Sequence, residues 1–333
     1  MMCVDYILSV CLDLIYFVSY QEYGYIYTMY NTTGATFQRL YGVPVKAVLY
    51  MTPCLLFLYV NGVMLFTLMS KPVFQETTRY ILFGHLLFSD SLHLTMSMVM
   101  YMLAVIRLKM ISYVCMVMSC SAGIIATISP FNLAVMSLER YVAICFPLRH
   151  AQIATCRRTH VAIAVMWVLG SLNSLIEVFV FVTIESTPFT MQIFCSRYNL
   201  YTQQIYIELN IAFTTLNFVT VGVIIIYTYI AILVTARSVS SDKTLASKAH
   251  KTVLLHLIQL GLCLSSTLFN TINTLIHWHM DPVVVMHIQY VLFVGLIIFP
   301  RCLSPLIYGL RDPTFKHVFK YYFAFGFRNS VKP

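Results

Sequence analysis

An acidic and a basic residue stand side by side where a long uncharged run of the sequence ends. They are Glu139 and Arg140, in the segment MSLERYVAICFPLRH at residues 136–150. An acid beside Arg140 can hold its guanidinium in a partly buried position, and loss of that contact would free the arginine to bind a partner. The alternative is a positive flank that only fixes the orientation of a membrane helix.

Metal and nucleophile chemistry have little support in the sequence. His277, His279 and His287 could bind a metal, but residues two apart on a helix point to different faces. No cysteine or carboxylate completes a metal-binding motif there. The sequence also lacks Gly-x-Ser-x-Gly, His-Glu-x-x-His and a phosphate-binding loop. We therefore do not expect an enzyme.

The composition is typical of an integral membrane protein. Of the 333 residues, 59% are hydrophobic and only 10% are charged, and the mean hydropathy is +0.80. Soluble domains carry about 25% charged residues, so these few charges cannot cover a water-facing surface. Long apolar runs favour a helical bundle over a β-barrel, whose strands would alternate in segments of about ten residues. Most of the ten cysteines lie in apolar runs, where they act as small hydrophobic residues.

The apolar runs predict an all-α membrane protein, a bundle of seven transmembrane helices. Each run reaches the roughly 20 residues needed to cross about 30 Å of hydrocarbon. The predicted spans are 43–69, 80–105, 112–142, 159–183, 204–235, 252–277 and 284–309. Asp90 lies at the middle of the second span, and a charge at that depth is costly enough to be a functional candidate.

The distribution of basic residues predicts the orientation of the bundle. With the N-terminus outside, the inner segments hold fifteen of the 21 Lys and Arg residues and the outer segments hold five. Because the more basic side faces the cytoplasm, we expect the N-terminus outside and the C-terminus inside. This placement accounts for the net charge of +9 without a nucleic-acid partner.

The two terminal segments have separate features. The N-terminal segment, residues 1–42, contains the only Asn-x-Ser/Thr sequon, at Asn31, and we expect glycosylation there on the outside. After the bundle at 43–310, residues 311–333 form the tail. Apolar residues recur with helical spacing from Phe315 to Phe323, which predicts a short amphipathic helix lying on the lipid of the inner leaflet.

Three stretches resemble motifs of odorant receptors, a branch of the rhodopsin-like G protein-coupled receptors. Residues 136–150 resemble MAYDRYVAICxPLRY at the inner end of the third helix. Residues 248–257, KAHKTVLLHL, resemble KAxxTCxxHL in the sixth helix, and residues 304–308, SPLIY, resemble Asn-Pro-x-x-Tyr in the seventh. The sequence from Met29 also looks like the start of such a receptor, so 1–28 could be an upstream extension or a real N-terminus. The aromatic-rich loops look more like the fish branch.

The resemblance implies that a heterotrimeric G protein binds at the inner end of the bundle. In the family the arginine matching Arg140 loses its partners on activation, and two tyrosines move toward the third helix. Proline kinks the seventh helix, and a histidine of the sixth belongs to the polar lock near the arginine. The residues implied in coupling and activation are Glu139, Arg140, Tyr141, Tyr227, Lys248, Lys251, His256, Pro305 and Tyr308.

The resemblance also implies a disulfide and suggests an ion site. The family joins its third helix to the second outer loop at the positions of Cys115 and Cys195. It binds an allosteric sodium ion at the position of Asp90, and oxygen ligands here would come from Asp90, Asn61, Ser129 and Ser304. The alternative is a structural polar network without an ion, and serine at 304 is a poorer ligand than the family's asparagine. We expect no other cofactor.

A ligand in such receptors lies between the outer halves of helices three, five, six and seven. Distance from the matched motifs gives the candidates Gly123, Ala126, Thr127, Glu208, Ile211, Thr215, Leu264, Thr271, Tyr290 and Val294. Small and apolar residues dominate, with a few hydrogen-bonding threonines, as a small-molecule site requires. Glu208 or Glu177 could select a cationic group, or could lie at the outer membrane surface.

These features predict an odorant receptor of the plasma membrane, in olfactory cilia if the resemblance holds. It would bind a small-molecule odorant outside and activate an olfactory, stimulatory G protein inside, which raises cAMP. A rhodopsin-like receptor for another small ligand is the alternative, but it would not share PLRH at 147–150 or the motif at 248–256. A transporter or channel would need paired intramembrane charges or discontinuous helices, and Asp90 alone does not supply them.

Overall fold

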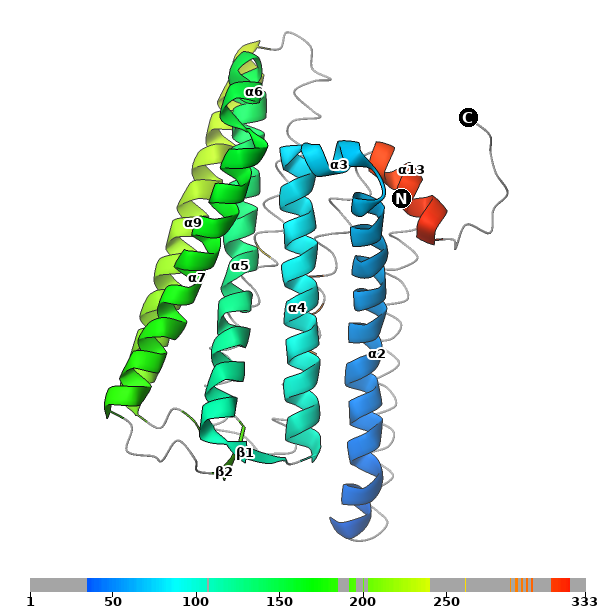
Figure 1. The fold of residues 1–333 in the computed structure, drawn as a ribbon, viewed down its shortest axis with the longest axis vertical. Coiled ribbons are helices and arrows are strands. Elements are labelled where there is room, and N and C mark those ends of the chain that lie inside the picture. The colour runs from blue at the N-terminus through cyan, green and yellow to red at the C-terminus, as the bar shows by residue number, and fades with distance from the viewer. Residues whose placement is uncertain are drawn as a thin grey trace.

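Five long helices make up most of the described part of this computed structural model. It describes residues 35–106, 108–184, 192–195, 200, 203–239 and 313–323, and the single positions 261, 288, 291, 292, 295, 298 and 301. The long helices are α2 (Ala35–Met69), α4 (Thr78–Ile106), α5 (Ser112–Cys145), α7 (Cys156–Ile184) and α9 (Gln204–Val239). They run side by side along the molecule (Figure 1).

Each of these five helices contains a stretch long and apolar enough to cross a membrane. A helix satisfies its backbone hydrogen bonds internally, which hydrocarbon requires, so uncharged runs of this length form helices rather than strands. The first five predicted spans are therefore confirmed. The spans 252–277 and 284–309 lie outside the described residues, apart from single positions.

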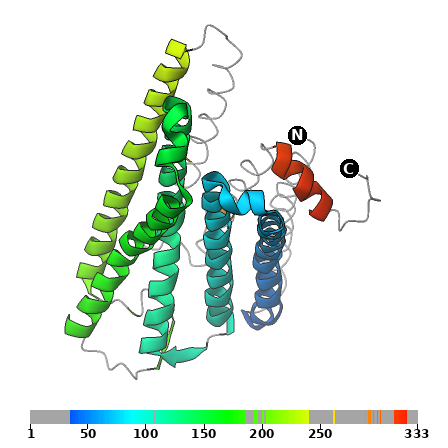
Figure 2. The ribbon, with the colours of Figure 1, turned by 45° about the horizontal axis from the view of Figure 1, so that its top comes forward.

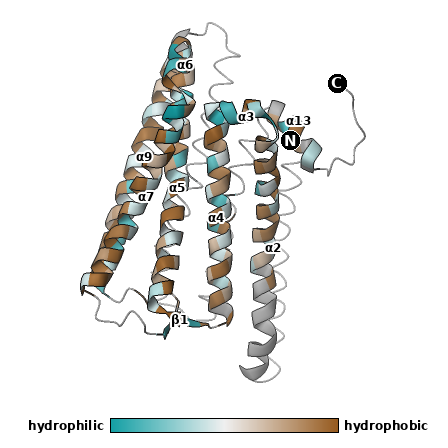
Figure 3. Ribbon diagram, in the orientation of Figure 1, coloured by the Kyte–Doolittle hydropathy of each residue, from teal (hydrophilic) through white to brown (hydrophobic). Residues whose placement is uncertain are grey.

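Short elements connect the long helices at both ends of the bundle. At one end, called here the Arg140 end, lie α3 (Pro72–Glu76), the 3-10 turn η1 (Pro147–Arg149) and α6 (His150–Ile153). At the other, called the disulfide end, β1 (Lys109–Ile111) pairs antiparallel with β2 (Gln192–Phe194). Figure 3 shows the long helices mostly brown, with hydrophilic teal at α3 and α6.

Helix α5 is the centre of the bundle, because α4, α7 and α9 all pack against it. Buried apolar clusters hold the helices together at both ends. Phe83, Met64 and Met136 belong to the cluster at the Arg140 end, and Cys115 and Phe181 to one at the disulfide end. Ser129 of α5 lies between residues of these two clusters, Cys120 toward the disulfide end and Phe131 toward the Arg140 end.

A short helix, α13 (Pro313–Phe323), packs across the Arg140 end of α2. Phe315 and Phe319 are fully buried there, and the Phe315 ring lies 5.6 Å from the Phe83 ring and 5.9 Å from the Phe74 ring. The other face carries exposed Tyr321. Figure 2 shows α13 beside α3, close to the end of α2. The helix lies within the range predicted from the sequence, and its contact with lipid stays a prediction.

Candidate functional site

Three polar side chains from separate helical segments meet in the apolar middle of the bundle. Asp90 of α4, Ser129 of α5 and Arg301 have exposed fractions of 1%, 2% and 6%. The Arg301 Nη1 donates to Asp90 Oδ1 at 2.8 Å and to Ser129 Oγ at 3.1 Å, and the Ser129 hydroxyl donates to the same Asp90 oxygen at 2.6 Å. Each of the three side chains is therefore hydrogen-bonded to the other two, and Asp90 and Arg301 form an ion pair within this triangle.

The structure brings together two of the four residues predicted for a sodium site and adds a cation to them. Asn61 is also buried, and its Nδ2 has no partner in the described structure. Ser304 lies outside the described residues. Hard cations need several oxygen ligands at once, whereas a guanidinium already bonds the Asp90 oxygen. As arranged, this site does not fit a sodium ion.

Arg301 is the functional residue that sequence reasoning missed. It lies inside the predicted seventh span, so it belongs to neither the fifteen inner nor the five outer basic residues among the 21 in the chain. A basic residue inside a span signals an acidic partner, so Arg301 could have been singled out from the sequence. That signal does not say which acid it contacts, because Glu177 and Glu208 also lie inside predicted spans.

Glu139 contacts two cationic or protonatable groups at the Arg140 end. Its Oε2 lies 3.8 Å from Arg140 Nε, and its Oε1 lies 3.4 Å from His150 Nε2 at the start of α6. The Glu139 side chain is 9% exposed and that of Arg140 is 20% exposed. The acid and base predicted from the sequence are therefore in contact, at a site that solvent reaches in part.

Helices α5 and α9 meet beside this pair. The Tyr141 and Tyr227 rings lie 5.9 Å apart, and the Cys145 thiol donates to Thr235 Oγ1 at 3.3 Å. Tyr227 thus lies near α5, the third predicted span, and its movement on activation stays a prediction. The other residues predicted for coupling lie outside the described part of the chain: Lys248, Lys251, His256, Pro305 and Tyr308.

Two of the predicted ligand residues pack between helices α5 and α7. Thr127 Oγ1 donates to the Gly170 carbonyl at 3.3 Å and to its own-helix Ile124 carbonyl at 2.7 Å. A Cβ on Gly123 would lie 3.4 Å from Ser174 Oγ. The sequence could not separate residues that face a ligand from residues that face a neighbouring helix. Their role in ligand binding stays a prediction.

The remaining ligand candidates are placed only in part. Ala126 of α5 is half-buried, and Glu208, Ile211 and Thr215 are exposed on α9 at spacings of three and four residues, so they share a face. Leu264, Thr271, Tyr290 and Val294 lie outside the described residues.

Glu177 on α7 is a buried acid near the disulfide end. It is 2% exposed and accepts a hydrogen bond from Asn173 Nδ2 at 3.3 Å. The sequence left open whether this acid selects a cationic group or lies at the outer membrane surface, and its role stays a prediction. By contrast, Glu208 is exposed and accepts a hydrogen bond from Gln204 Nε2 at 3.0 Å.

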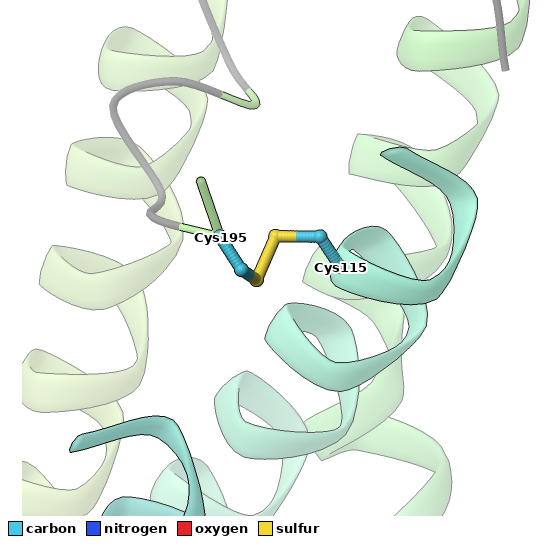
Figure 4. The surroundings of a disulfide bond; sticks show 2 residues. All are labelled: Cys115 and Cys195. Carbon is cyan, nitrogen blue, oxygen red and sulfur yellow. A yellow bond between two sulfur atoms is a disulfide. The ribbon is translucent and has the colours of Figure 1, made fainter. Parts of the chain in front are cut away.

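The predicted disulfide joins Cys115, in the first turn of α5, to Cys195, directly after β2 (Figure 4). Their Cα atoms lie 5.4 Å apart, within the range that disulfides adopt. The β1–β2 pairing lies next to it and fixes the same two segments. The segment before α9 is thereby held over the end of the bundle.

Comparisons with known proteins agree with this arrangement. The sequence model of the seven-transmembrane receptors of the rhodopsin family matches residues 60–308. Odorant receptor 131-2 of Danio rerio is 35% identical over 272 residues, which are 80% of this chain and 82% of that protein. Adenosine receptor A2b of Homo sapiens is 39% identical over 58 residues, 17% of this chain and 18% of that receptor.

Proposed function

We propose a function from the family to which this chain belongs, the fish-type odorant branch of the rhodopsin-type seven-transmembrane receptors. It binds a small-molecule odorant in the half of the bundle at the disulfide end. It activates a heterotrimeric G protein of the stimulatory type at the Arg140 end, which raises cAMP. The observation that carries the proposal is the 35% sequence identity to an odorant receptor, in an alignment that covers 80% of this chain.

The proposal includes an orientation in the plasma membrane. The disulfide end faces outward, because a disulfide persists in an oxidising compartment. The Arg140 end then faces the cytoplasm, and it carries exposed Lys71, Arg149, Arg157 and Arg158, as the positive-inside rule requires. α13 would lie along the inner leaflet, and the protein would reach olfactory cilia.

The mechanism we propose is a shift between two bundle arrangements. An agonist binds the active arrangement more tightly than the inactive one, and its differential affinity sets the shift. In the inactive arrangement Glu139 holds Arg140, at 3.8 Å from its Nε. Activation would separate this pair and present Arg140 and the neighbouring Tyr141 and Tyr227 to the G protein.

The experiment that tests the proposal measures cAMP in cells that express the full chain with a stimulatory olfactory G protein. The cells receive pooled water-soluble odorants, and the matched variants are Arg140→Ala and Arg157→Ala. Both remove one positive charge from the same end, but Arg157 is exposed at the start of α7 and away from the Glu139 contact. We expect an odorant response that Arg140→Ala abolishes and Arg157→Ala retains, at equal surface expression.

Two results would contradict this proposal. An Arg140→Ala response equal to that of the unaltered chain would remove Arg140 from the mechanism. Silence to all odorants with confirmed surface expression would favour a rhodopsin-type receptor for another small ligand. Adenosine is the first such ligand to add, because 58 residues are 39% identical to an adenosine receptor.

A further inference from the structure

The charge pair in the middle of the bundle is complete without any bound ion. Asp90 contributes one negative charge and Arg301 one positive charge, and their closest atoms are 2.8 Å apart. Both side chains are almost fully buried. A charge in an apolar interior is tolerated when it is paired and hydrogen-bonded. This pair is hydrogen-bonded through Arg301 Nη1, while Arg301 Nε has no partner in the described structure.

We propose that Arg301 is a tethered counter-cation that replaces a sodium ion at Asp90, so that the stability of this receptor does not depend on sodium. The proposal goes beyond the proposed function, because it concerns the interior of the bundle and needs no odorant. It also differs from the sodium site suggested by the resemblance.

The hydrogen-bonding capacity of the site supports the replacement. Asp90 Oδ1 accepts from both Ser129 and Arg301, at 2.6 Å and 2.8 Å. The Ser129 hydroxyl has one proton, which it gives to Asp90, while its oxygen accepts from Arg301 at 3.1 Å. The guanidinium thus engages both Asp90 Oδ1 and the Ser129 oxygen, two of the oxygens predicted to ligate a cation.

Electrostatics supports it as well. With Arg301 present, the cluster of Asp90, Ser129 and Arg301 is neutral, and an added sodium ion would make it positive next to a fixed guanidinium. Two positive charges bound to the same carboxylate would lie within a few ångströms of each other, about 4 Å, and would repel strongly in a medium of low dielectric. Arginine also suits a buried ion pair better than lysine does, because its guanidinium is weakly hydrated and always charged.

Because this cation is covalently attached to the chain, it also holds its own segment in place, which a free ion cannot do. Ile298, three residues before Arg301, is fully buried in the apolar cluster that also holds Tyr50 and Cys54 of α2 and Leu94 of α4. Ile298 and Arg301 therefore both hold their segment against neighbouring helices. Movement of that segment away from α4 would leave two unpaired buried charges.

The test is the melting temperature of the purified full-length receptor in detergent, in NaCl and in choline chloride at equal ionic strength. We expect equal melting temperatures in the two salts for the unaltered chain. Arg301→Met should melt several degrees lower, because Asp90 loses its partner, and should become more stable in NaCl than in choline chloride. Adding Asp90→Asn to Arg301→Met should remove that sodium dependence and restore part of the lost stability.

Three results would overturn the proposal. The first is a melting temperature of the unaltered chain that rises saturably with NaCl but not with choline chloride. The second is an Arg301→Met variant as stable as the unaltered chain. The third is an Arg301→Met variant whose melting temperature is the same in NaCl and in choline chloride. If Arg301→Met does not fold, the unaltered chain and Arg301→Lys still test the proposal. Both retain a cation at position 301, so each should have the same melting temperature in NaCl as in choline chloride. None of these measurements uses an odorant, so failure of the proposed function would be seen separately.

Discussion

At the scale of single residues, this receptor places full charges in two different environments. Asp90 and Arg301 are buried and bond each other directly, whereas Glu139 and Arg140 are partly exposed and 3.8 Å apart. Removing one partner of a buried pair costs about 3–5 kcal/mol, while an exposed pair contributes about 1 kcal/mol or less. The first pair therefore suits a structural role, and the second can open at little cost.

Glu139→Gln should raise basal signalling, because it removes the charge that Arg140 and His150 contact at 3.8 Å and 3.4 Å. A partly exposed contact is worth about 0.5–1 kcal/mol, so basal cAMP should rise about two- to five-fold. The measurement is cAMP without odorant at matched surface expression. Glu76→Gln is the control, because Glu76 is an exposed acid of α3 at the same end. Equal basal cAMP in both variants would show that Glu139 does not restrain Arg140.

The sequence identified Asp90, Glu139 and Arg140 as candidates, but of the two ion pairs it predicted only the one between Glu139 and Arg140. Glu139 and Arg140 are neighbours in sequence, so their contact follows from position. Asp90 and Arg301 are 211 residues apart, and their pairing depends on which helix faces lie together in the bundle. Two intramembrane charges would also suit a transporter, but the family of the chain makes that alternative unnecessary.

At the scale of helices, hydropathy and charge determine the limits of a span but not its neighbours. The third predicted span, 112–142, begins with α5 at Ser112 and ends three residues before Cys145. Helix α5 even continues through Pro130, which lacks the hydrogen bond to the Ala126 carbonyl. The close packing of α5 on α7 could not be predicted, since apolar residues surround both helices.

Gly170→Ala should weaken the contact between α5 and α7. A Cβ at Gly170 would lie 2.8 Å from Thr127 Oγ1 and 3.1 Å from Ile128 Cδ1, and threonine is stiff in a helix. Overpacking of this kind costs about 1–3 kcal/mol, so the melting temperature of the purified receptor should fall. Adding Thr127→Ala should recover most of the loss.

Gly222→Ala in α9 is the matched control for that substitution, because a Cβ there meets nothing within 4 Å. It should leave the melting temperature unchanged or raise it, since alanine has a higher helix propensity than glycine. If Gly170→Ala were as stable as Gly222→Ala, the close approach of the two helices would have no energetic weight.

At the scale of the whole molecule, the chain is held at one end by the disulfide and at the other by α13. The resemblance predicted the disulfide between Cys115 and Cys195, and the structure confirms it. The five described spans follow from hydropathy alone. The docking of Phe315 and Phe319 against the bundle did not follow from the sequence, because an apolar helix face has the same pattern whether it packs on protein or on lipid.

The disulfide should stabilise the entire bundle, since it links the start of α5 to the segment before α9 across 80 residues of chain. Loss of a disulfide that closes a long loop costs about 2–5 kcal/mol, and we expect the lower part of that range because membrane helices already restrict the unfolded chain. Cys115→Ser should therefore lower both surface expression and melting temperature. The double variant Cys115→Ser/Cys195→Ser should behave like the single one, because the single substitution already removes the disulfide.

Cys156→Ser separates this effect from the general loss of a thiol. The Cys156 side chain donates to the Glu76 carbonyl at 2.9 Å, and a serine hydroxyl can make the same bond, so this variant should match the unaltered chain. Reducing agent should bring the unaltered chain to the melting temperature of the double variant and leave the double variant where it was. A double variant as stable as the oxidised chain would mean that the β1–β2 pairing and the helix contacts alone hold the disulfide end.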